Sequence, residues 1–275
     1  KKGEKDVIPA RLYAHPFTRK PDQVLLSIAV TEVGMDAESL AAVMALPREV
    51  SIAISPYARR DAAQLEGLRL AGHELFTMLP VMTNRYPAED PGPLSVIGRM
   101  PEDEALRRTR TILAKVPGGV GMLLPANETL SSYPETLAIP LKEIAARGLY
   151  IASANPGRTV AQLTSDNGIA AIMRRADLIV DADATDAKIL SRLAGVIPSA
   201  LEKGEYFITV SARPRSLELL ARWLKETPLP APVVLAPLTA LYLPREAPPP
   251  PAEEASGGHG GGEKKKEQPK PTAKK

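Results

Sequence analysis

The chain has 275 residues, of which 44% are hydrophobic, and this apolar fraction excludes a fully disordered protein. It has no cysteine, which excludes disulfides, thiol nucleophiles and cysteine-bearing metal sites. No apolar run approaches the ~18 residues that a membrane span requires. The length fits two domains of about 150 residues each or one α/β barrel.

The net charge of +3 is unevenly distributed along the chain. Residues 1–20 carry +4 and residues 247–275 carry +2, which leaves −3 for residues 21–246. Because phosphate binding needs clustered Lys and Arg on the fold, we expect no nucleic-acid partner. The basic ends are expected to be disordered and solubilising, although they could also contact an anionic surface.

Both ends of the chain differ in composition from the part between them. Residues 1–22 are polar, with one short apolar patch at Leu12, Tyr13 and Phe17, and we expect a linker that leads into the fold. Residues 245–275 hold a polyproline run, a glycine-rich stretch and a lysine block, so we expect a disordered tail. The chain begins with Lys, and we expect that a targeting segment or membrane anchor could precede residue 1.

Between the two ends, short β-branched runs alternate with helical patterns. Strands are expected at residues 25–30, 50–54, 74–79, 120–124, 149–152, 177–180, 206–210 and 233–236. Helices are expected at residues 35–46, 59–71, 101–116, 134–147, 159–174, 185–203 and 214–225. This repeated alternation predicts an α/β fold with a parallel sheet and outer helices, either closed into a barrel or doubly wound.

In a parallel α/β fold the reactive groups lie beyond the carboxyl ends of the strands. No histidine occupies these positions. The carboxylates there are Glu32, Glu128, Asp181 and Asp183. We interpret the two aspartates as the cap region of the following helix, and Met78 and Met82 as side chains that fill core or cleft volume.

Nucleophilic catalysis has no visible base, because Ser153 and Ser211 lack a histidine partner in the sequence pattern. His73 precedes a predicted strand and therefore falls at the opposite end of the sheet. We interpret it as a structural residue.

Several short motifs occur in a defined order. The most specific is Tyr-Pro-Ala-Glu-Asp-Pro-Gly-Pro at residues 86–93. The others lie at residues 13–17, 55–58, 71–74, 79–80, 116–121, 147–149 and 213–214. With these motifs, residues 9–243 resemble the divergent polysaccharide deacetylase family, in its alphaproteobacterial branch.

The resemblance implies a distorted (β/α) barrel of about seven units over residues 23–244, within the glycoside hydrolase/deacetylase barrel superfamily. It also implies carbohydrate as the substrate class and the periplasm or cell envelope as the location. Active-looking members resemble metal-dependent deacetylases. They carry an Asp pair after strand one and histidines in or after strands three, four and seven.

At these positions the present chain carries a degenerate set of residues. Thr31 and Glu32 replace the Asp pair, Met78 stands in the third strand, Pro125 follows the fourth, and Ser211 follows the seventh. One carboxylate alone does not hold a zinc ion. We therefore expect no metal cofactor and an inactive protein, and would expect zinc only if the family mechanism survived.

The expected function is binding of a polysaccharide such as peptidoglycan, or of an envelope protein. The ligand would occupy the cleft that corresponds to the active site of the family. The candidate binding residues are Glu32, Tyr86, Asp90, Asn127 and Glu128. Tyr86 would stack on a sugar, while the rival interpretation makes its loop a rigid turn. Two alternatives remain: a metal-free hydrolase with Glu32 and Glu128 as a carboxylate pair, or a tethering protein acting through its tail.

Overall fold

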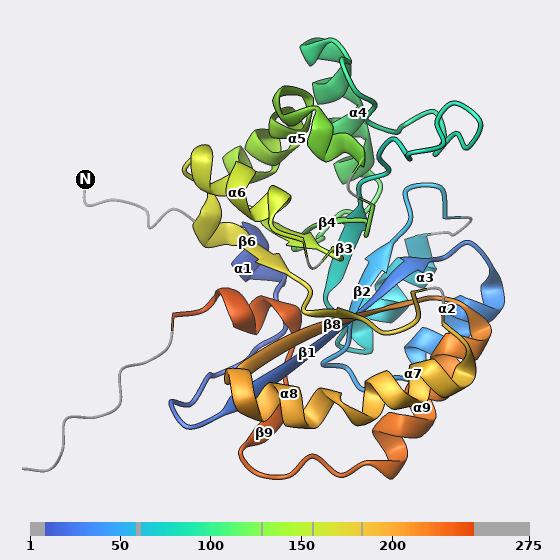
Figure 1. Ribbon diagram of the computed structural model, residues 1–275, viewed down its shortest axis with the longest axis vertical. Helices are drawn as coiled ribbons and strands as arrows, with labels where there is room; N and C mark the ends of the chain where they lie inside the picture. The colour runs from blue at the N-terminus through green and yellow to red at the C-terminus, as the bar shows by residue number, and fades with distance from the viewer. Residues whose placement is uncertain (1–8, 59–61, 128, 156, 183, 245–275) are drawn as a thin grey trace, which may run out of the picture.

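The computed structural model describes residues 9–58, 62–127, 129–155, 157–182 and 184–244 of the chain. Its centre is a curled parallel sheet with helices on the outside (Figure 1). The strands are β1 (Val24–Val33), β2 (Ser51–Ile54), β3 (Leu75–Met78), β4 (Gly121–Leu124), β5 (Tyr150–Ser153), β6 (Met173–Arg175), β7 (Leu178–Ile179), β8 (Glu205–Ser211) and β9 (Val233–Leu235).

The helices alternate with these strands along the chain. The α-helices are α1 (Pro9–Tyr13), α2 (Ala37–Met44), α3 (Ala62–Leu70), α4 (Glu102–Ala114), α5 (Pro134–Ala146), α6 (Thr159–Asp166), α7 (Asp186–Ala194), α8 (Val196–Lys203) and α9 (Pro214–Glu226). Short 3₁₀ turns cover Thr129–Ser132, Ala170–Ile172 and Leu238–Tyr242. In the described part of the chain, no helix is both long and apolar enough to cross a bilayer.

The sheet runs in the order β6-β5-β4-β3-β2-β1-β8-β7, and β9 pairs with the first part of β1. Its two outermost strands, β6 and β7, are separated by only two residues. The Ala176 N–H donates to the Ser153 carbonyl of β5 at 2.8 Å, and the Asp177 N–H donates to the Phe207 carbonyl of β8 at 2.7 Å. One short segment therefore joins both edges of the sheet, which confirms the predicted distorted barrel.

All eight predicted strands are present, but two predicted helices differ from the structure. The helix expected at residues 159–174 ends at Asp166, because Gly168 adopts a left-handed φ of 70° and a 3₁₀ turn and β6 follow. The helix expected at residues 185–203 is divided at Gly195 into α7 and α8. Pro198 lies in the first turn of α8, where its missing N–H costs nothing.

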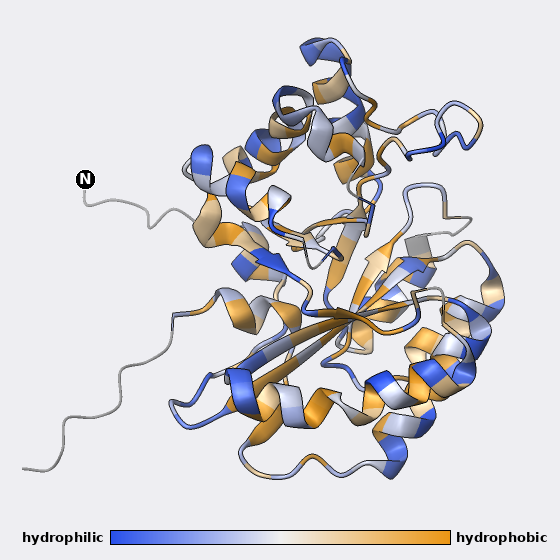
Figure 2. Cartoon of the chain, viewed as in Figure 1, coloured by the Kyte–Doolittle hydropathy of each residue, from blue (hydrophilic) through white to orange (hydrophobic). Residues whose placement is uncertain are grey.

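The core lies on both sides of the curled sheet, and Figure 2 shows the strands as mostly hydrophobic. Inside the barrel, Phe76 and Phe207 pack among small residues such as Ala29 and Ala152. A side chain on Gly121 would overlap the Tyr150 carbonyl oxygen, so the backbone there requires glycine. Outside, aliphatic side chains of the strands pack against the apolar faces of the helices. Burial of both faces explains why the strands are continuously apolar.

Residues 9–22, expected as part of a linker, instead pack against the barrel. Ala10 is fully buried, and its N–H donates to the Gly148 carbonyl at 3.2 Å. The guanidinium of Arg19, which is also buried, pairs with Glu205 of β8 at 2.9 Å. Ala14 and Phe17 are partly buried against the same core, whereas Leu12 and Tyr13 remain exposed. The expected disordered tail at residues 245–275 lies outside the described residues.

The carboxylate of Glu74, at the start of β3, joins four segments at the amino-terminal end of the barrel. Its Oε1 accepts the His15 N–H at 2.9 Å and the Thr239 hydroxyl. Its Oε2 accepts the Thr239 N–H at 3.1 Å and the Ser51 hydroxyl at 3.3 Å. Glu74 is 1% exposed, and burial raises the pKa of its carboxyl group against the lowering effect of these hydrogen bonds.

Next to this carboxylate, His73 is also buried. Its Nδ1 lies 2.8 Å from the Val50 carbonyl, so Nδ1 carries the proton and Nε2 does not. Among the described residues, Nε2 has no hydrogen-bond partner. Burial lowers the pKa of His73 below its usual value. The structural role expected for His73 fits this geometry.

Replacing Glu74 with Gln is expected to destabilise the fold by about 2 kcal/mol, because the amide NH₂ would face a fixed backbone N–H of His15 or Thr239 in either orientation. Urea denaturation measures this loss. The exposed Glu202 of α8 is the matched control, and Glu202→Gln is expected to change the free energy of unfolding little. Equal stability of the two variants would contradict the role of the carboxylate.

The lowered pKa of His73 predicts that stability falls as the pH drops below the ordinary histidine value of 6.5, since the unfolded chain takes up the proton more readily than the folded one. In His73→Asn the amide can still donate to Val50 but does not titrate. Lowering the pH from 7.5 to 5 should therefore reduce the free energy of unfolding more for the wild type than for the variant. A constant difference would show that His73 does not titrate differently in the folded state.

Candidate functional site

A cleft of about 580 Å³ opens at the carboxyl ends of β1 to β4. Its lining comes from the ends of β1 and β3 and from the loops that follow the four strands. The lining residues are Glu32, Met35, Ser55, Pro56, Tyr57, Met78, Leu79, Pro80, Val81, Thr83, Pro91, Pro125, Ala126 and Asn127. Of the residues proposed from sequence, the structure thus brings together Glu32, Met78, Pro125 and Asn127.

Glu32 stands at the mouth of the barrel in an unusual backbone conformation. Its φ is 62°, in the left-handed region that a non-glycine residue adopts at a cost of about 1 kcal/mol. Its N–H donates to the Sδ atom of Met78 at 3.0 Å, which ties the end of β1 to the end of β3. The Glu32 side chain is exposed, so its carboxylate is accessible to a ligand.

Tyr57, which the sequence interpretation did not single out as a site residue, connects the cleft to the loop of residues 86–93. Its phenol oxygen accepts the Leu94 N–H at 3.0 Å. A side chain on Gly92 would meet the Tyr57 ring at 2.7 Å, so the loop packs directly on the ring. Burial raises the pKa of Tyr57, which keeps its phenol protonated. The Ser-Pro-Tyr-Ala motif at residues 55–58 was the signal that pointed to this position.

Tyr86 and Asp90 lie on the projecting loop (Figure 1) but are not among the residues that line the cleft. Tyr86 is 37% exposed. The Asp90 carboxylate accepts the Gly92 N–H at 2.8 Å, so it stabilises its own turn, as the rival interpretation expected. From this loop, only Pro91 reaches the cleft.

Asn127 is held in place by its own turn and by a neighbouring loop. Its Oδ1 accepts the Thr129 N–H at 2.9 Å, and its amide NH₂ has no hydrogen-bond partner among the described residues. The Asn155 Nδ2 donates to the adjacent Ala126 carbonyl at 2.7 Å. Asn155 therefore positions this wall of the cleft, a role that the sequence did not reveal. Glu128, the other candidate carboxylate, lies outside the described residues.

Thr31 and Ser211 lie side by side, because they are register partners on β1 and β8. The buried Asp181 carboxylate accepts the Ser211 N–H at 3.1 Å with both oxygens and lies 3.4 Å from its hydroxyl. The expected cap role of Asp181 is therefore wrong, since α7 begins five residues later, after Thr185. Asp181 instead fixes the end of β8.

The residues at the mouth do not fit a zinc ion. No group of three or more His, Asp or Glu side chains converges anywhere in the described part of the chain. Among the described residues that line the cleft, Glu32 is the one carboxylate, Met78 offers a thioether already engaged by a backbone N–H, and Pro125 offers no donor. A thioether and one carboxylate are not a donor set for this metal.

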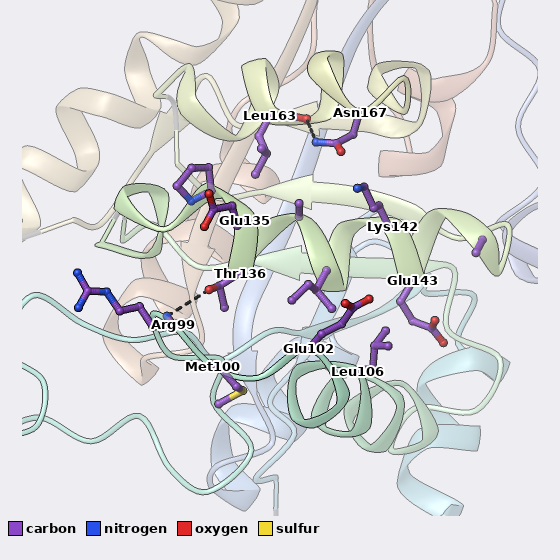
Figure 3. Close-up of a pocket in the computed structure, with 14 residues that line it drawn as sticks. Arg99, Met100, Glu102, Leu106, Glu135, Thr136, Lys142, Glu143, Leu163 and Asn167 are labelled. Atoms are coloured by element: carbon purple, nitrogen blue, oxygen red, sulfur yellow. Dashed lines mark hydrogen bonds between the residues drawn. The ribbon is translucent and has the colours of Figure 1, made fainter.

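A larger hollow of about 820 Å³ lies between α4, α5 and α6, on the outside of the barrel (Figure 3). Charged side chains such as Glu102, Glu135 and Lys142 surround it. Because it lies away from the strand ends and contains none of the residues proposed from sequence, we place the candidate site in the cleft.

The comparisons with known proteins agree with this architecture. The sequence matches the family described as divergent polysaccharide deacetylase over residues 28–242, whereas no curated protein matches it. The fold is similar to that of an uncharacterized protein from Agrobacterium tumefaciens C58, with a TM-score of 0.78 and 21% identity, covering 87% of this chain and 97% of that one.

A family 2 AP endonuclease from Brucella melitensis is more distant, with a TM-score of 0.44 and 11% identity over 75% of this chain and 100% of that one. The family match, by contrast, spans most of the described residues. The chain belongs to the divergent polysaccharide deacetylase family.

Proposed function

We propose that this protein binds an envelope polysaccharide such as peptidoglycan in the cleft, without metal-dependent hydrolysis. The observation that carries the proposal is the lining of the cleft, in which Met78 and Pro125 occupy positions where the family resemblance implies metal ligands. Membership of a family named for polysaccharide deacetylation supports a carbohydrate ligand. We extend this to a location in the periplasm or cell envelope.

The lining of the cleft suits recognition better than bond cleavage. The exposed Glu32 carboxylate accepts hydrogen bonds from hydroxyls, and the Asn127 NH₂ donates them. Without a metal ion to polarise an acetyl carbonyl, such contacts hold a ligand but do not stabilise a hydrolytic transition state. The left-handed φ of Glu32 also supports a binding role for this end of the barrel, because backbone strain of this kind clusters at binding sites.

The first test is retention on insoluble peptidoglycan in a pull-down assay. Glu32→Gln and Asn127→Ala are each expected to lower retention about tenfold, the loss of one charge-assisted or buried hydrogen bond. Glu226→Gln is the matched control, because this exposed residue ends α9 at the opposite end of the barrel. Its retention should equal that of the wild type.

Melting temperatures distinguish a binding role from a structural one. Both cleft variants should melt within a few degrees of the wild type, because neither side chain is buried. If the wild type is not retained at all, the polysaccharide proposal fails. If the variants are retained normally, binding does not involve the cleft.

The second test is the metal content of the purified protein. Because the described mouth residues do not form a zinc donor set, elemental analysis after dialysis should give much less than one zinc per chain. Added zinc should leave the melting temperature unchanged, since only a ligand of the native state raises it. Stoichiometric zinc that raises the melting temperature would overturn the metal-free part of the proposal.

A further inference from the structure

The deep part of the cleft is chemically different from its rim. Among the lining residues, Met78, Leu79 and Val81 are the most buried apolar ones, with exposed fractions of 6%, 0% and 4%. The lining also contains four prolines, which have no backbone N–H to offer: Pro56, Pro80, Pro91 and Pro125. Carbon and sulfur therefore dominate the interior surface.

Two polar groups of this deep part already accept hydrogen bonds from within the chain. The Ser55 hydroxyl accepts the Tyr57 N–H at 3.2 Å. The Pro80 carbonyl accepts the Val96 N–H at 2.9 Å. A sugar hydroxyl placed here would lose its water and find little hydrogen-bonding capacity in return. A ligand group that enters this deep part of the cleft is therefore expected to be largely apolar.

The rim has the opposite character. Glu32 is exposed and Asn127 is half-buried, and both keep hydrogen-bonding capacity for a polar group. Met35, which also lines the cleft, is 54% exposed. Methionine is flexible and polarisable, so it adapts to an aliphatic chain that leaves the cleft.

Building on the proposed function, we infer that the cleft recognises a sugar that carries an aliphatic chain. The chain lies against Met78 in the apolar interior, and the sugar hydroxyls contact Glu32 and Asn127 at the rim. The volume of about 580 Å³ is within the range of small-molecule sites, about 300–1,000 Å³. A bare sugar would leave the interior unfilled.

Two probes that differ only in their aliphatic group test this inference. Isothermal titration calorimetry compares the two, with octyl β-D-glucoside kept below its micelle concentration. The octyl glucoside is expected to bind at least about tenfold more tightly than methyl β-D-glucoside. Burial of only two of its methylenes would already give this factor. Met78→Gln should reduce octyl glucoside binding to the level of the methyl glucoside. Its amide oxygen can still accept the Glu32 N–H.

Two further variants separate specific binding from loss of folding and from adsorption. Met35→Gln changes an exposed side chain, so it should lower octyl glucoside binding without affecting the melting temperature. Leu70→Gln is the control, because Leu70 is 79% exposed at the end of α3, on the side of the barrel opposite the cleft. This variant should bind as the wild type does.

The outcomes distinguish the inference from the proposed function. If both glucosides bind equally, or if neither binds, the aliphatic inference is overturned, and retention on peptidoglycan alone decides the proposed function. If octyl glucoside binds more tightly but Met35→Gln and Met78→Gln both bind it as the wild type does, adsorption elsewhere explains the difference and the inference is also overturned. Loss of the octyl preference in both variants, but not in Leu70→Gln, supports it.

Discussion

The packing at the amino-terminal end of the barrel, which we call the closed end, depends on the Glu74 carboxylate. Each of its oxygens accepts a backbone N–H from a different terminal segment, His15 before β1 and Thr239 after β9. A buried carboxylate is unfavourable unless such donors surround it, so the four segments that it joins stabilise one another only when all are in place. This requirement fixes the amino-terminal end of the sheet and leaves the other end free to vary.

The inward-facing residues of β3, together with Glu74 just before it, show how the two ends of the barrel differ. From the closed end to the mouth they are Glu74, Phe76 and Met78, a charged group, an aromatic ring and a thioether. Phe76 fills the middle of the barrel because small residues on neighbouring strands make room for it. The chemistry of the mouth is therefore set by a few terminal residues, while the packing below them holds the fold.

The sequence predicted the strands well because continuous β-branched apolar runs are characteristic of a parallel sheet buried on both faces. It missed β6 because Met173, Arg174 and Arg175 form no apolar run. It missed α1 because one buried alanine, Ala10, carries much of its contact with the barrel. Local pattern contains little information about either element, since both are stabilised by tertiary contacts.

The candidate site was predictable only in part. The rule that parallel strands end on one face correctly placed Glu32, Met78, Pro125 and Asn127 in one cleft. It gave no information on loop conformation, which directs Asp181 towards Ser211 and connects Tyr57 to Leu94. These contacts join residues about 30 to 40 positions apart through irregular backbone, so sequence periodicity does not reveal them.

The segment that links β6 to β7 has a consequence for assembly. An open parallel sheet ends in two rows of unpaired backbone groups, where a strand from another chain can add. Here both rows are covered by the same few residues, with β5 bonded on one side and β8 on the other. A partner therefore cannot add a strand beside β5 or beside the middle of β8, where this segment is already bonded. Recognition there must use side chains and loops, in which sequence can change without disturbing the barrel.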